Sequence, residues 1–313
     1  MRKKRTLLLC AACALLAILA LLAYSSTTAE PSYDGHPLNY WVVRLNDSSP
    51  AAFAPGLGPT EPEHDKATNA IDRIGVAALP FFLRWIQFEP ALSKPVLGYW
   101  LFRTHLPFAQ SIFDRLSGRR AGQLAAGTVS AFGLLGTRAT PAMDELCRLM
   151  NQTNATFTCR RALAALSFLG PKALPPLLTV VTNEYSGLRV EALDYIAAMP
   201  NLGDTADLAV PALTQCLSET SKPLVQENAA YALGRLRAAP QLSVPALMAC
   251  LSSTDRTLRA NSARALGAFG PQASNAVPAL ANALTDSNGF VRGSAAMALH
   301  QIDPVTFPLS FVH

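Results

Sequence analysis

The stretch Ala209-Val210-Pro211-Ala212-Leu213 returns as Ser243-Val244-Pro245-Ala246-Leu247 and again as Ala276-Val277-Pro278-Ala279-Leu280. Outward from it, prolines recur at intervals of 27 to 36 residues, at positions 80, 107, 141, 175, 211, 245 and 278. Self-similarity at such a period is typical of a stack of small structural units and not of one closed globular core. The period therefore decides the fold class.

Each repeat contains two amphipathic segments. Upstream of the proline, apolar residues recur at i, i+3, i+4 and i+7, which is one face of a helix; Ala263, Leu266, Phe269 and Gly270 are an example. A glycine that closes such a run fits a left-handed helix terminus. In three repeats the proline follows that glycine by five residues and would lie in the first turn of a second helix. These pairs are Gly75/Pro80, Gly136/Pro141 and Gly170/Pro175.

The second segment is also apolar on one face, and polar turn residues follow it, as in Asp286-Ser287-Asn288. A single helical hairpin cannot bury its apolar face, so neighbouring hairpins must stack. No stretch alternates with period two, so no strand is expected. The sequence predicts an all-α protein, a right-handed α-solenoid of about seven stacked helical hairpins.

The run from Leu258-Arg259 through Ala265-Leu266-Gly267 to the proline motif at 278 resembles the HEAT-repeat superfamily, in particular the bacterial proteins with PBS-lyase HEAT-like repeats. The resemblance covers residues 62–303 and is strongest from residue 205 onward. It implies a concave binding face lined by second helices. It also implies a structural ladder that braces adjacent repeats. The ladder residues are Asp255, Arg259, Asp286 and Arg292, with Gln226 and Cys159 in the arginine position of earlier repeats.

The amino terminus has the pattern of an export signal. Arg2-Lys3-Lys4-Arg5 precedes an uncharged apolar run from Leu7 to Tyr24, and a basic segment before an apolar one directs export. The run is long for a cleaved peptide and just long enough to span a bilayer. We therefore expect residues 1–29 to be a signal peptide or a membrane anchor, with residues 6–24 as the tether, and the repeats to lie in the periplasm or outside the cell.

Two further segments flank the repeats. Residues 30–61 read as a linker, rich in Ser, Thr, Pro and Gly, that contains a short helix starting at Pro37. That helix would cap the first repeat with Leu38, Trp41, Val42 and Leu45, or would present Tyr40 and Trp41 to a ligand. Residues 304–313 form a proline-broken tail that could fold back over the last repeat.

Charge gives no case for nucleic acid. Four of the 26 Lys and Arg residues belong to the amino-terminal basic segment, which leaves 22 basic against 21 acidic side chains. Nucleic-acid binding needs Lys and Arg clustered on one face. Cys147, Cys216 and Cys250 occupy nearly the same place after the repeat proline, which indicates small packing residues rather than ligands.

Catalytic motifs are also missing from the sequence. Deoxyhypusine hydroxylase, a HEAT-like enzyme, holds iron with His-Glu pairs, and none of the five histidines here is followed by Glu. Phycobilin lyases share the repeat frame but act in the cytoplasm, which the export signal argues against. No zinc-binding spacing, nucleophile motif or glycine-rich phosphate loop occurs. We expect no catalytic residue, cofactor or metal.

The sequence therefore favours a non-catalytic binding or scaffold protein of the cell envelope, whose concave helical surface binds a protein or peptide. Exposed residues of the second helices, Gln215 and Asn282, are the candidate contacts, together with Tyr40 and Trp41 of the cap. The alternative is a lyase-like or other minor-site enzyme, or a carrier of a chromophore or other ligand, on the same HEAT-like frame.

Overall fold

The structure is a computed structural model that describes residues 29–46, 61–89, 118–152, 156–200 and 202–308. Among these residues no helix is long and apolar enough to cross a membrane. The expected amino-terminal signal or anchor lies outside the described residues except for Ala29, as do Pro107 and the last five residues of the tail.

The described chain forms two compact units. The first contains the described residues up to Trp85 and those from 118 to Leu135, and the second contains Ile86–Glu89 and the described residues from Gly136 onward. The elements of the first unit are β1 (Ser32–Tyr33), β2 (His36–Pro37), α2 (Leu38–Asn46), α3 (Glu61–Ile74), the 3₁₀ helix η2 (Gly75–Ala78), α4 (Leu79–Trp85) and α7 (Arg119–Leu135).

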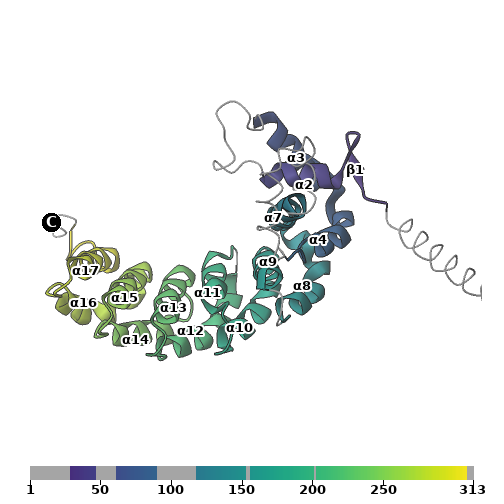
Figure 1. Cartoon of the computed structure of the whole chain (residues 1–313). Coiled ribbons are helices and arrows are strands. Elements are labelled where there is room, and N and C mark those ends of the chain that lie inside the picture. Colours follow the sequence, from purple (N-terminus) through teal and green to yellow (C-terminus); the bar gives the residue numbers. More distant parts are fainter. Residues whose placement is uncertain (1–28, 47–60, 90–117, 153–155, 201, 309–313) are drawn as a thin grey trace, which may run out of the picture. The chain divides into compact units, whose positions relative to one another are not determined.

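The second unit is the longer part of the repeat array (Figure 1). Its elements are η3 (Gly136–Ala142), α8 (Met143–Met150), α9 (Thr156–Ser167), η4 (Pro171–Ala173), α10 (Leu174–Thr182), α11 (Arg189–Ala198), η5 (Gly203–Ala209), α12 (Val210–Leu217), α13 (Pro223–Leu236), α14 (Pro240–Cys250), α15 (Arg256–Ala268), η6 (Gly270–Ala276), α16 (Val277–Ala283) and α17 (Gly289–Ile302). Odd-numbered helices from α9 to α17 are first helices of a hairpin, and even-numbered ones are second helices. The prediction of an all-α solenoid is confirmed.

The predicted helix boundaries hold at the repeat glycines. Gly75, Gly136 and Gly170 have φ angles of +61°, +52° and +78°, the left-handed conformation that ends a helix. The expected short turn before the proline is a 3₁₀ helix in most repeats. The repeat of α13 and α14 has no glycine there, and Arg237 and Ala239 take the positive φ angles instead. In that repeat the second helix begins early, so Pro245 lies inside α14.

The amino-terminal segment contains a small hairpin that the sequence pattern did not predict. Ser32 pairs with Pro37 and Tyr33 with His36 in antiparallel register, around a turn in which Asp34 and Gly35 both have positive φ. The helix that follows, α2, packs against α3 and α7. A Cβ on Gly127 of α7 would lie 2.2 Å from the carbonyl oxygen of Val42, so only glycine permits this contact.

In the second unit the first helices approach one another more closely than the second helices do. A Cβ on Gly234 of α13 would lie 2.7 Å from the Cα of Ala265 in α15, and one on Gly267 would lie 2.8 Å from the Cα of Ala298 in α17. No Cβ fits at these positions, because the backbones of neighbouring first helices are in close contact there. Figure 1 shows α11, α13, α15 and α17 along the inner side of the curve of this unit and their second helices along its outer side.

The expectation that second helices line the concave face is therefore corrected for this unit: the first helices line it. The physical reason is the small size of the residues between first helices. When the distance between neighbouring helices is shorter in one row than in the other, the stack curves, and the row with the shorter distances lies on the concave side. The second helices α8, α10, α12, α14 and α16 contain no glycine, and their buried residues include larger side chains such as Leu213 and Leu247.

A matched pair of glycine substitutions tests this packing. Gly234→Ala should lower the free energy of unfolding by about 1–3 kcal/mol, because the added methyl group meets the backbone of α15. Gly293→Ala, in α17, should raise it by about 0.5–1 kcal/mol, since a Cβ there meets nothing within 4 Å and alanine favours the helix. Urea denaturation followed by circular dichroism measures both. Equal effects would contradict the close approach of the first helices.

Candidate functional site

The cap aromatics are occupied by contacts within the cap itself. Trp41 is only 3% exposed, and its indole N–H donates to the carbonyl oxygen of Tyr33 at 3.1 Å. Tyr40 is half-buried between the ring of His36, stacked at 4.0 Å, and the guanidinium of Arg44, 3.5 Å from the ring centroid. Both faces of the Tyr40 ring are therefore covered. This corrects the expectation that Tyr40 and Trp41 are exposed contacts for a ligand.

Gln215 and Asn282 are exposed on α12 and α16. They lie on the outer row of helices, among small or uncharged side chains. On α12, α14 and α16 the other exposed residues are Pro211, Gln241, Leu242, Pro245, Ala249, Pro278 and Ala281, and none of them is charged. This surface offers little charge or large apolar area to a partner.

Three of the four expected ladder residues meet at one loop. Nε and Nη2 of Arg259 donate to both carboxylate oxygens of Asp286, at 2.7 and 2.9 Å, and these hydrogen bonds lower the pKa of Asp286. Arg292 donates to the backbone carbonyl of Asp286 at 2.8 Å. The pair joins α15 to the loop that leads into α17. Asp255 has a different role: its side chain caps the amino-terminal end of α15 by accepting a hydrogen bond from the backbone N–H of Thr257 at 2.7 Å.

A second arginine pair was missed by the sequence reading. Arg189, at the start of α11, is 3% exposed and donates through Nη1 and Nη2 to both carboxylate oxygens of Glu219. Its Nε donates to the carbonyl oxygen of Val181 at 2.7 Å. Arg189 is the first residue of α11, whereas the other ladder residues are the fourth of their helices, so it stands 37 residues before Gln226 and the fixed repeat spacing does not find it.

The residue at the ladder position (Cys159, Arg189, Gln226, Arg259 or Arg292) makes the same kind of hydrogen bond in every repeat of this unit. Its side chain donates to a backbone carbonyl at or just beyond the end of the preceding second helix, where carbonyls lack helical partners. Gln226 donates to Leu217 at 2.7 Å, and Cys159 to Gln152 at 2.9 Å. The ladder is therefore a set of loop closures, and only some of its members add an ion pair.

Breaking the buried pair should be costly. Arg189→Met is expected to lower the free energy of unfolding by about 3 kcal/mol, because Glu219 keeps its charge with only the longer contact to Lys222, at 3.7 Å, in place of two hydrogen bonds. Arg148→Met is the control: Arg148 pairs with Glu145 on the surface, with side-chain exposures of 57% and 37%, and should cost less than about 1 kcal/mol. Chemical denaturation at pH 7 measures the difference. Similar losses in the two variants would argue against a special role for Arg189.

The same pair predicts a pH dependence. The hydrogen bonds from Arg189 hold the pKa of Glu219 below its ordinary value of 4.5. A depressed acid pKa stabilises the fold above the unfolded-state pKa, and this stabilisation is lost as pH falls through the folded-state pKa. The stability gap between the native chain and Arg189→Met should therefore be constant above about pH 5 and shrink below it. Denaturation curves from pH 3 to 7 measure this; a gap independent of pH would contradict it.

The cysteines show no sign of chemistry. Cys147 is half-buried, Cys159, Cys216 and Cys250 are buried, and all four are free thiols. Burial raises the pKa of each of them, so they stay protonated and unreactive at neutral pH. Within the described residues no group of His, Cys, Asp and Glu is placed to hold a metal ion.

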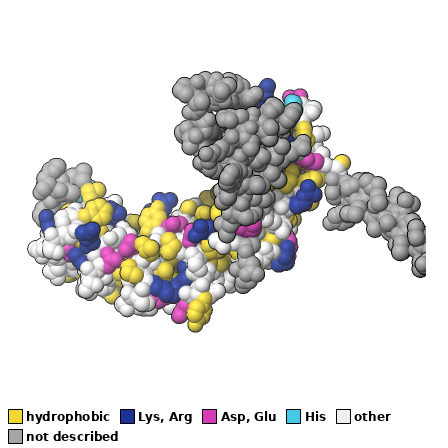
Figure 2. All heavy atoms as spheres, in the orientation of Figure 1, with side chains coloured by type: hydrophobic (Ala, Val, Ile, Leu, Met, Phe, Trp, Pro, Cys, Tyr) yellow, Lys and Arg dark blue, Asp and Glu magenta, His cyan; other side chains and the backbone are white. Residues whose placement is uncertain are grey.

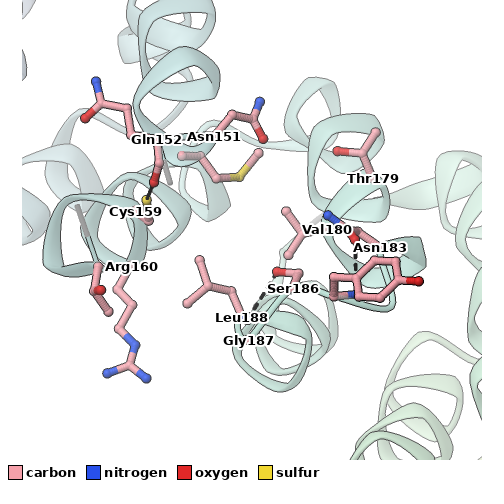
Figure 3. A pocket seen from close by; sticks show the side chains of 13 residues that line it. Asn151, Gln152, Cys159, Arg160, Thr179, Val180, Asn183, Ser186, Gly187 and Leu188 are labelled. Atoms are coloured by element: carbon pink, nitrogen blue, oxygen red, sulfur yellow. Dashed lines mark hydrogen bonds between the residues drawn. The ribbon is translucent and has the colours of Figure 1, made fainter. Parts of the chain in front are cut away.

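A hollow of about 750 Å³ lies between the α8–α9 and α10–α11 loops of the second unit (Figure 3). Its polar groups are committed to local bonds: Asn151 donates to Cys147, and the side-chain oxygen of Ser186 accepts from Leu188. Arg160 pairs with Glu191, and Figure 3 shows its guanidinium turned away from the hollow. Ligand sites need polar groups that converge on one point, and this hollow has none among the residues drawn.

The inner, first-helix row differs from the outer row in having large exposed apolar side chains. Leu224 and Tyr231 of α13 are 63% and 50% exposed, and Phe290 and Met297 of α17 are 56% and 42% exposed. Among the described second helices, only α14 has such a residue, Leu242. Leu224 and Phe290 are both the second residue of their helix, and Tyr231 and Met297 are both the ninth. The equivalent residues of α15, which lies between α13 and α17, are Thr257 and Arg264.

Two adjoining hollows lie on the same row, between the carboxy-terminal halves of the first helices. The smaller, about 190 Å³, is lined by residues of α13 and α15 that include Tyr231 and Arg264. The larger, about 510 Å³, reaches Gln301 of α17. They share Gly234, Arg235 and Ala268. We call the two hollows together the first-helix furrow. In Figure 2 hydrophobic and basic side chains both appear over the helices from α11 to α17.

Comparison with known families agrees with this geometry. Residues 244–306 match the family model of HEAT repeats, and residues 225–253 match that of the PBS lyase HEAT-like repeat. Residues 225–306 therefore contain HEAT repeats. The matched region contains α13 to α17, the repeats that carry the furrow. A comparison with curated proteins finds no match.

Solved structures of similar shape include Kap121p, with a TM-score of 0.51, 12% identity and coverage of 85% of this chain and 29% of Kap121p. Kap121p bound to Pho4p gives a TM-score of 0.51, 13% identity and the same coverage. This HEAT-repeat chain thus spans less than a third of Kap121p, and the likeness shows the fold alone. Human deoxyhypusine hydroxylase in complex with glycerol matches at a TM-score of 0.34, 20% identity and coverage of 85% and 96%, too low to support an argument.

Proposed function

We propose that this HEAT-repeat protein is a non-catalytic scaffold that binds a protein or peptide on the first-helix row of α13, α15 and α17. The observation that carries the proposal is the gathering of large exposed apolar side chains on that row. Apolar side chains grouped on a surface are typical of protein interaction sites, and aromatic residues dominate the binding energy of such sites. Tyr231 and Phe290 are the aromatic members of the group.

The fold supports the proposal in a general way. Solenoids expose long surfaces because each repeat contacts only its neighbours. Kap121p, a structure of the same fold, was solved in complex with Pho4p, so a solenoid of this kind can hold a protein partner. The outer row has one exposed apolar side chain of this size, Leu242 of α14. Gln215 and Asn282 lie on other helices of that row and therefore supply the control positions.

Paired charge-introducing variants test which row binds. Leu224→Glu with Met297→Glu should reduce cross-linked affinity capture of the partner from cell envelopes about tenfold, equal to about 1.4 kcal/mol, since both introduce charge into an apolar contact. Gln215→Glu with Asn282→Glu adds the same charge to the outer row and should leave capture unchanged. Quantitative mass spectrometry of the captured proteins gives the readout. The opposite pattern would assign binding to the second helices, and two unaffected captures would contradict both rows.

We further propose that the chain is exported, with residues 1–29 as a cleaved signal or as a membrane tether through residues 6–24. Support comes from the sequence alone: a basic segment followed by an apolar run of bilayer length. Exposure of the repeats outside the cytoplasm would place the first-helix row among envelope proteins or peptides.

Fractionation tests the location. A carboxy-terminally tagged full chain expressed in a bacterium should be digested by protease added to spheroplasts, because the repeats lie outside the cytoplasmic membrane. Deletion of residues 2–29 should make the tag resistant until the cells are lysed. Recovery of the full chain in the membrane pellet after a carbonate wash would identify the tether, and recovery in the soluble fraction would identify the cleaved form. Resistance of the full chain in intact spheroplasts would contradict export.

A further inference from the structure

The first-helix furrow is basic. Arg235 and Arg237 stand at the carboxy-terminal end of α13, and Arg264 lies in the middle of α15; all three are exposed and line the hollows. Arg264 lies over the ring of Phe290, 4.3 Å from its centroid, which orients its guanidinium. Basic residues at the end of α13 are favoured by the helix dipole, but that effect does not account for Arg264.

The furrow arginines have no acidic partner among the described residues. The acidic residues from 219 to 303 are Glu219, Glu227, Asp255, Asp286 and Asp303, and each has a structural role. Glu219 and Asp286 bind the ladder arginines. Glu227 lies beside Asp255, and the carboxylate of Asp255 caps α15 by accepting from the backbone N–H of Thr257. Asp303 accepts from the backbone N–H groups of Val305 and Thr306.

The type of basic residue is informative as well. Every basic residue from 223 to 303 is arginine. The planar guanidinium forms two parallel hydrogen bonds with a carboxylate and stacks on aromatic rings, which lysine cannot do. Tyr231 and Arg264 occupy equivalent positions of neighbouring first helices, roughly 8–10 Å apart. An extended chain advances about 3.3 Å per residue and would cross that distance in about three residues.

We propose that the furrow binds an acidic, extended segment of the partner protein, whose carboxylates pair with Arg235 and Arg264 while an apolar side chain enters the hollow beside Tyr231. The inference rests on the proposed function and names its partner chemistry. The small hollow is floored by Gly234, Ala265 and Ala268, which leaves room for a side chain from outside.

A defined peptide tests the inference on the full-length chain in a neutral detergent. The probe is a fluorescein-labelled octapeptide with leucine at its third and sixth positions and glutamate elsewhere; the control peptide has lysine in place of glutamate. Fluorescence anisotropy should show binding of the glutamate peptide only, and the affinity should fall as salt rises. Serine in place of leucine should weaken binding, because the hollow then stays unfilled.

Three single variants locate the site. Arg235→Glu and Arg264→Glu should each weaken binding of the glutamate peptide about tenfold or more. Arg256→Glu makes the same charge change at the amino-terminal end of α15, away from the furrow, and should change the affinity less than about twofold. Thermal melts check that each variant is folded. Arg235→Glu serves as the test if Arg264→Glu is unstable, because the Arg235 side chain makes no ion pair or hydrogen bond within the described residues.

The outcomes separate the inference from the proposed function. Equal binding of both peptides, no binding of either, or equal loss in Arg256→Glu and Arg235→Glu would overturn the acidic-segment inference. Envelope capture by Arg235→Glu at the native level would also overturn it, yet would leave the scaffold function intact. Loss of capture in Leu224→Glu with Met297→Glu bears on the scaffold function alone, because neither residue lines the furrow.

Discussion

The close approach of the first helices is the constraint on which the rest of the second unit depends. At Gly234 and Gly267 a single methyl group would reach the backbone of the next helix, so these positions set the shortest distance between repeats. Side chains of ordinary size keep the second helices further apart. The difference bends the stack and makes the first helices its inner row.

A second constraint acts on the loops between hairpins: the backbone carbonyls at the ends of the second helices lack helical partners and need hydrogen-bond donors. One side chain per repeat satisfies them from the fourth position of the next first helix in most repeats, whether it is arginine, glutamine or cysteine. Where that residue is Arg259, its remaining N–H groups also bind a carboxylate of the following loop, that of Asp286. The register of neighbouring hairpins is thus fixed by hydrogen bonds at one edge and by glycine contacts at the other.

Local features of the fold could be predicted from the sequence because they depend on neighbouring residues. A glycine at +78° and a proline five residues later specify a helix end and a helix start without reference to the rest of the chain. The concave row could not be predicted, since curvature is a difference between two interhelical distances that many side chains set together. Arg189 was not predicted because it lies at the first position of its helix and not at the fourth, outside the repeat period. The sequence could not tell whether Tyr40 and Trp41 are exposed or packed within the cap. Their contacts with His36, Arg44 and Tyr33 show that they are packed.

The electrostatic character of the furrow follows from these structural duties. Helix capping and loop bracing draw the acidic side chains to the loops and to the amino-terminal ends of the first helices, where Asp255 meets the helix dipole favourably. The carboxy-terminal halves of the same helices keep their arginines without neutralising partners in the described structure. A nearly neutral array therefore has a basic inner furrow, although its composition shows no excess of positive charge. The net charge of the chain gave no indication of a partner, because acidic and basic residues lie at opposite ends of the same helices and cancel in the total. An acidic segment would bind only at the basic end.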